Sequence, residues 1–151
     1  MTMYRRWPDM ASLIADLMTR EWSGLAMAAA EQAVGETARD RIVDGLVRAV
    51  TGLRTHPMFR RIVELDPEIL LPYLVDRRGT SQDHILDQLV RLLREGQADG
   101  SVRAADPALL ARTAILTAHG FVLSASTMTD EVTLADIDSD LRLLFDRYLA
   151  P

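Results

Sequence analysis

Apolar residues recur every three or four positions along almost the whole 151-residue chain, and this periodicity constrains the fold more than any other feature. Such spacing places apolar side chains on one face of an α-helix. No stretch alternates apolar and polar residues as a half-buried β-strand would. The pattern therefore predicts an all-α protein, a helical bundle around one core.

Helix-breaking and capping residues divide this pattern into segments. Asp9 is expected to cap the first helix, and His56-Pro57 separates the second from a short third. Pro72 should kink or split the fourth, because proline cannot donate the backbone hydrogen bond. The expected segments are 9–35, 37–55, 57–65, 67–77, 80–98, 107–126 and 133–149.

The segment 107–126 is apolar on nearly every side. A helix without a polar face must be covered twice, here by its own core and by a partner subunit. The last segment carries a further apolar seam. We therefore expect both helices to form a four-helix interface in a homodimer, and the predicted contacts are Leu116, Phe121, Leu141, Phe145 and Tyr148.

Composition and motifs argue against several function classes. The net charge of −5 excludes binding of nucleic acid by bulk charge. The absence of cysteine excludes a disulfide framework and a cysteine metal site. Ser124 and His119 lie five apart on one helix, which does not bring them face to face, and no phosphate-binding loop is present. We expect no enzyme activity and no cofactor.

Two acidic clusters resemble metal sites but fail on spacing. Asp83 and His84 are adjacent, so with Asp87 they cannot close a metal site. Asp136, Asp138 and Asp140 mimic the start of a calcium loop, but Leu141 and Arg147 stand where the loop needs Gly and Glu. We expect no metal, and we expect Asp138 to pair with Arg142 four residues later.

No targeting segment is apparent. A twin-arginine signal would require an apolar region after the two arginines. Arg5-Arg6 is instead followed closely by Pro8. The most apolar stretch, 114–125, contains His119 and is taken as too short to span a bilayer. The expectation is a cytoplasmic protein without a membrane partner.

Residues 2–9, Thr-Met-Tyr-Arg-Arg-Trp-Pro-Asp, resemble the end of the DNA-binding head of tetracycline-repressor (TetR) family regulators. Glu95 to Gly100, Val102-Arg103 and Asp106 to Ala111 are similar to the boundary before the two dimerisation helices of that family. The resemblance implies that residues 1–8 are the remnant of the head and residues 9–151 the ligand-binding and dimerisation domain. It implies phosphate contacts for Tyr4, Arg5 and Arg6, while the bulk of the helix-turn-helix is missing.

The same resemblance implies a function. The chain would be a transcriptional regulator, by family default a repressor, whose body senses a small-molecule effector and which binds operator DNA only if the missing head is present. The alternative is a naturally headless ligand-binding body or a dominant-negative dimerisation partner. The effector pocket would lie among the middle helices, and its candidate lining residues are Met18, Trp22, Phe59, Tyr73, His84 and His119.

Overall fold

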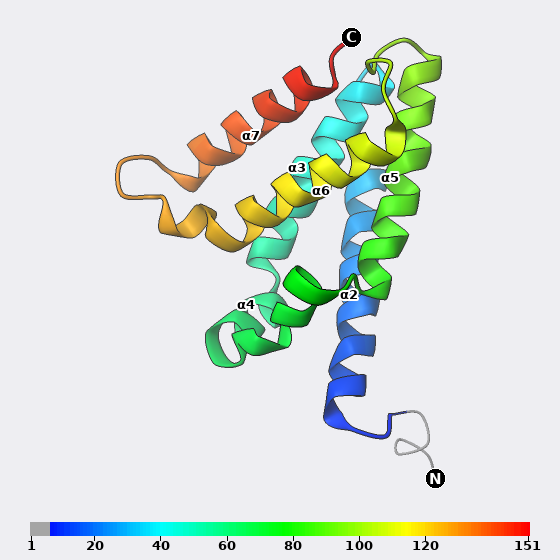
Figure 1. Cartoon of the computed structure of the whole chain (residues 1–151). Coiled ribbons are helices and arrows are strands. Elements are labelled where there is room, and N and C mark those ends of the chain that lie inside the picture. Colours follow the sequence, from blue (N-terminus) through cyan, green and yellow to red (C-terminus); the bar gives the residue numbers. More distant parts are fainter. Residues whose placement is uncertain (1–6) are drawn as a thin grey trace.

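A computed structural model describes residues 7–151, which form helices and no strand (Figure 1). This confirms the predicted all-α class. Tyr4, Arg5 and Arg6, the predicted phosphate contacts, lie outside the described residues. The helices are α2 (Met10–Glu31), α3 (Ala38–Thr55), α4 (Pro57–Leu65), α5 (Thr80–Ala98), α6 (Pro107–Ser124) and α7 (Leu134–Leu149), with short turns η1 (Pro67–Ile69), η2 (Pro72–Asp76) and η3 (Ala125–Thr127).

The helices begin where the sequence places capping side chains. Asp9 accepts a hydrogen bond from the backbone N–H of Ser12 at 2.7 Å, and Asp106 accepts one from Ala108 at 2.9 Å. Thr133 and Asp136 form a reciprocal capping box at the start of α7. These side chains satisfy backbone donors that have no partner inside a helix. The N-cap residue of α5 is Gly79.

The expected helix over residues 67–77 is split, as Pro72 predicts. Pro67–Ile69 forms one 3₁₀ turn, and Pro72–Asp76 forms a single π turn closed by the N–H of Arg77 and the carbonyl of Pro72 at 2.9 Å. Proline lacks the N–H that a continuous α-helix needs at this position. The result is an irregular corner between α4 and α5 (Figure 1).

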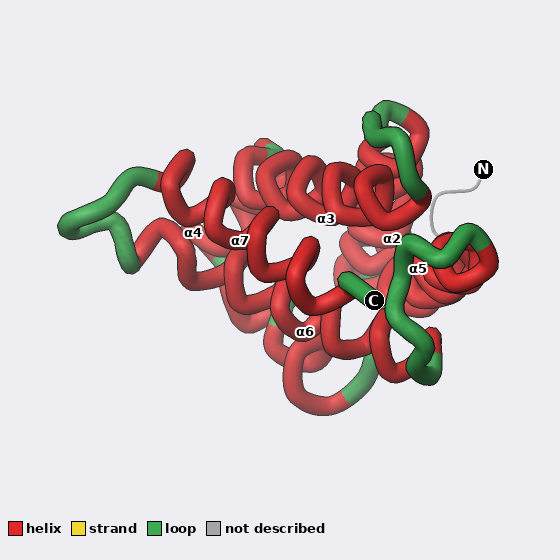
Figure 2. The backbone as a smooth tube through the Cα atoms, turned by 90° about the horizontal axis from the view of Figure 1, so that it is seen from above, coloured by secondary structure: helices red, strands yellow, loops and turns green. Residues whose placement is uncertain are grey.

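Helix α3 is the centre of the bundle, with contacts to α2, α4, α5, α6 and α7. Seen from above, α3 lies between the α2–α5 side and the α7 side (Figure 2). Leu141 and Phe145 of α7 are 0 % exposed and belong to this core. The prediction that they contact a partner subunit is therefore wrong, because the chain itself already covers them.

Polar pairs fix α7 antiparallel on α3. Asp44 of α3 accepts a hydrogen bond from Arg142 of α7 at 2.7 Å. Arg54 of α3 pairs with Asp138 of α7 at 2.6 Å, and both side chains are largely buried. The predicted pair of Asp138 with Arg142 is wrong, because each residue finds a partner across the interface with α3 instead.

Helix α6 leaves much of its apolar surface uncovered within one chain. It packs on α3 and α5, yet Leu109 and Leu123 are exposed and Leu116 is 71 % exposed. The continuous stretch Pro107–Thr127 is long and apolar enough to cross a bilayer, so the argument from length made above does not hold. The uncovered leucines are seven residues apart, and this spacing places them in one stripe along the helix.

Candidate functional site

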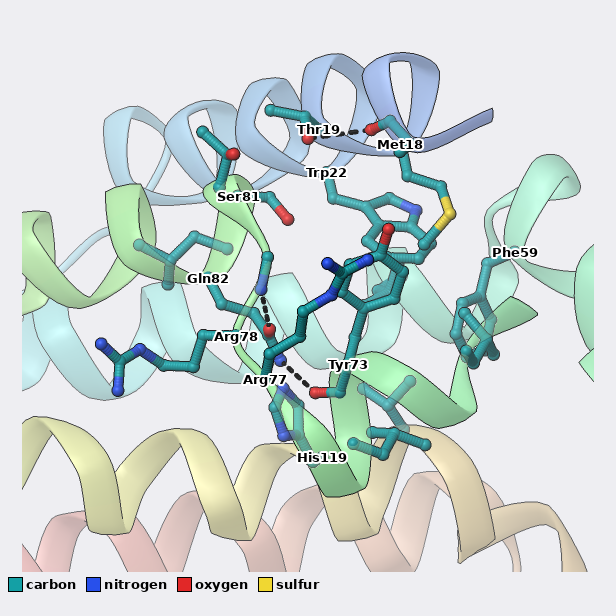
Figure 3. A pocket seen from close by; sticks show the side chains of 18 of the residues that line it. Met18, Thr19, Trp22, Phe59, Tyr73, Arg77, Arg78, Ser81, Gln82 and His119 are labelled. Atoms are coloured by element: carbon teal, nitrogen blue, oxygen red, sulfur yellow. Dashed lines mark hydrogen bonds between the residues drawn. The ribbon is translucent and has the colours of Figure 1, made fainter. Parts of the chain in front are cut away.

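A cavity of about 330 Å³ lies where α2, α4, the irregular corner, α5 and α6 meet. Its volume falls in the range of small-molecule sites. Five of the six predicted pocket residues line it: Met18, Trp22, Phe59, Tyr73 and His119. Figure 3 shows Trp22 and His119 on opposite sides, with Tyr73 and Arg77 between them.

The inner wall is apolar and packed. Met18 and Phe59 are buried, and the rings of Trp22 and Phe59 meet edge to face with centroids 6.1 Å apart. This geometry is a favourable one for two aromatic rings. Trp22 comes from α2 and Phe59 from α4, so the contact helps to hold α4 against the body.

The corner supplies the polar rim around Tyr73. Gln82 donates a hydrogen bond to the carbonyl of Tyr73 at 3.2 Å and accepts one from the N–H of Gly79 at 2.7 Å. A Cβ on Gly79 would lie 3.1 Å from the Tyr73 ring, so a glycine allows the ring to sit against the backbone here. The Arg77 guanidinium lies 5.6 Å from the centroid of the same ring.

Two of the lining residues, Trp22 and His119, carry ring nitrogens. The Nε1 of Trp22 is buried and has no hydrogen-bond partner among residues 7–151. Burial lowers the pKa of His119, so its imidazole is neutral at pH 7 and offers one donor and one acceptor. Unpaired buried donors are rare and are a sign of an absent partner.

The charged side chains that line the cavity are both arginines. Among the described residues that line it there is no Asp or Glu, while Arg77 and Arg78 stand at its rim. Arg78 donates to Asp83 at 2.7 Å. Sequence patterns did not indicate Arg77, Arg78 or Gln82 as pocket residues. Each lies in or beside the irregular corner, where helical periodicity cannot predict the direction of a side chain.

His84 is the one predicted pocket residue that lies elsewhere. It is exposed on α5 and lines a separate surface pocket with Ser23 and Met27. No group of three His, Cys, Asp or Glu side chains within residues 7–151 is placed to hold a metal ion. The pairing of Asp83 with Arg78 leaves the cluster of Asp83, His84 and Asp87 as ordinary helix surface.

The remaining predicted interface residues fall into two environments. Leu116 is exposed, and Phe121 lines an open groove of about 600 Å³ between α6 and α7 together with Met128, Val132 and Ile137. Tyr148 is half-buried, and the Arg103 guanidinium lies 4.8 Å from the centroid of its ring. Tyr148 is therefore largely occupied by contacts within its own chain.

The amino-acid sequence was compared with those of known proteins. No family model matches the chain. It is 29 % identical over 148 residues to an uncharacterised HTH-type transcriptional regulator of Mycobacterium bovis, covering 98 % of this chain and 76 % of the relative. Regulators of the same description from Mycobacterium tuberculosis match at the same identity and coverage.

Solved structures give the same architecture. A Rhodococcus sp. RHA1 protein of unknown function superimposes with a TM-score of 0.71 at 22 % identity, covering 95 % of this chain and 74 % of that protein. The TetR-family transcriptional repressor QsdR of R. erythropolis also gives 0.71, at 15 % identity, covering 98 % of this chain and 78 % of the repressor. The chain therefore has a TetR-like fold, with a cavity of about 330 Å³ among α2, α4, α5 and α6 and an uncovered apolar stripe on α6.

Proposed function

We propose that the chain is the effector-binding and dimerising body of a cytoplasmic TetR-like transcriptional repressor. The observation that carries this proposal is the cavity, which gathers five residues expected from the sequence. The similarity to HTH-type transcriptional regulators supports the same class, which is not enzymatic. Residues 1–8 would be the end of the DNA-binding head, and residues 9–151 the body.

In such a regulator the effector acts through a shift of population. Effector and operator DNA prefer different arrangements of the two heads, and their coupling equals the difference in affinity between those arrangements. The cavity is bounded by α2, the first helix after residues 1–8. A ligand that fills the space between Trp22 and His119 would therefore press on the helix that leads to the head.

Homodimerisation would cover the stripe of Leu109, Leu116 and Leu123 on α6, together with the open groove beside Phe121. Aspartate at Leu116 would bury a charge in this interface at a cost of several kcal/mol. We expect Leu116→Asp to be monomeric by sedimentation equilibrium. Leu65→Asp is the matched control, because Leu65 is 57 % exposed at the end of α4, and it should stay dimeric. A dimeric Leu116→Asp protein would contradict this interface.

The regulatory function itself is tested by transcript profiling. Deletion of the gene should change a small, reproducible set of transcripts, and complementation with the wild-type gene should restore them. The Leu116→Asp allele should fail to restore them if the dimer is the working form, whereas Leu65→Asp should succeed. An unchanged transcript profile after deletion would count against a regulator.

A further inference from the structure

The cavity has an outer neighbour that shares one of its walls. This second hollow, of about 390 Å³, uses Tyr73, Leu74, Arg77, Arg78, Gln82 and His119 from the other side. Arg112 and Leu116 of α6 are among its other lining residues. The two hollows therefore share a largely polar wall, and the outer one reaches Leu116 of the α6 stripe.

The arginines along this wall differ in how far they are neutralised. Arg78 is held by Asp83 at 2.7 Å, and Arg112 donates to the carbonyl of Ala108 within its own helix. No ion pair involves Arg77 among residues 7–151, where its recorded contact is the Tyr73 ring. Asp76, which lines only the outer basin, is the one acid among the described residues of either hollow. Arg77 therefore offers the least compensated positive charge beside the cavity.

We propose that the effector is an amphipathic anion, with an apolar body against the wall formed by Trp22 and Phe59 and a single carboxylate-like head at Arg77. This inference rests on the proposed effector-binding function and specifies its ligand class. Guanidinium groups form strong, often bidentate hydrogen bonds with carboxylates. A cationic ligand would meet no acid in the inner cavity, and a neutral one would leave Arg77 unused.

The other lining residues suit the same ligand. The neutral imidazole of His119 adds a donor or an acceptor without a competing charge. The apolar wall formed by Met18, Phe59 and Leu70 covers the chain or ring of the ligand.

Three probes of equal chain length test the ligand class by titration calorimetry on the full chain: decanoate, decanol and decylammonium, each kept below its micellar concentration. Decanoate should bind about tenfold more tightly than decanol, which is the scale of one charge-assisted hydrogen bond, and decylammonium should bind most weakly. The preference for decanoate should shrink at high salt, because Arg77 is exposed.

Adjacent arginines provide a matched pair of variants. Arg77→Met should reduce the affinity for decanoate to that for decanol and leave decanol binding unchanged, whereas Arg78→Met should retain the preference because Asp83 already neutralises Arg78. Tightest binding of decylammonium or decanol would overturn the anionic class while leaving the cavity a ligand site. An Arg77→Met protein that still prefers decanoate to decanol as strongly as the wild type would also overturn the anionic class. If no probe binds, effector binding at this cavity fails, and the inference fails with it.

Discussion

Asp44 gives the sharpest test of how the body is held together. Its side chain is buried, and the residue is 5 % exposed. It accepts hydrogen bonds from the Val34 N–H at 3.0 Å, Arg48 Nε at 2.6 Å and Arg142 Nη2 at 2.7 Å. Burial alone would raise the pKa of Asp44, but these donors outweigh it and lower the pKa to about 2. The ionised carboxylate therefore joins the α2–α3 turn, α3 and α7.

The lowered pKa of Asp44 determines how much its charge contributes to the free energy of unfolding. Relative to the ordinary value of 3.8, a shift to about 2 corresponds to about 2 kcal/mol of preference for the ionised form. Because the folded-state pKa is the lower one, this stability is present above pH 3.8 and is lost as the pH falls towards 2. Asp44→Asn keeps the shape and removes the charge, so its free energy of unfolding at pH 7 should fall by about 2 kcal/mol.

The assay is urea unfolding at one fixed protein concentration, because a dimer couples association to stability. The difference between wild type and Asp44→Asn should narrow from pH 7 to pH 3. Asp87→Asn, at an exposed position of α5, is the matched control and should change stability by less than about 0.5 kcal/mol. Equal stability of Asp44→Asn and wild type at pH 7, or a difference that does not narrow at low pH, would refute the reasoning.

Two further predictions concern buried side chains. Phe145→Ala should lower the free energy of unfolding by about 3–5 kcal/mol in chemical denaturation, because Phe145 is fully enclosed in its own chain. A loss below about 1 kcal/mol would contradict the burial of Phe145 within one chain. Burial lowers the pKa of His119 below 6.5, so the unfolded chain takes up the proton more readily and stability falls as the pH drops below about 6.5. His119→Gln should remove part of that loss in urea unfolding at pH 8 and pH 5.5, and an unchanged pH dependence would contradict it.

The sequence predicted the elements of the fold well, because their boundaries depend on local chemistry. Asp9, Asp106 and Thr133 cap helices through hydrogen bonds to residues two or three positions away. Pro72 interrupts its segment for an equally local reason. Periodicity also found the buried stripe of each helix, which is why five of the six pocket residues lie on one cavity.

The errors arose where two apolar faces compete on one helix or where a partner is distant in sequence. Leu141 and Phe145 are four residues apart and share a face, but periodicity cannot say whether that face meets α3 or another subunit. Arg142 could reach Asp138 within α7 or Asp44 across the bundle, and the buried carboxylate is the stronger acceptor. The place of Arg77 at the cavity could not be predicted, because it depends on how the irregular corner folds against the other helices.

The most direct test of the central claim is recovery of DNA with the protein from its own cells. A tag after Pro151, a cross-link in growing cells and sequencing of the recovered fragments would measure it. The account predicts enrichment of a few defined DNA sites and loss of that enrichment in the Leu116→Asp strain. Uniform background DNA with the wild-type protein would contradict its assignment to a transcriptional regulator.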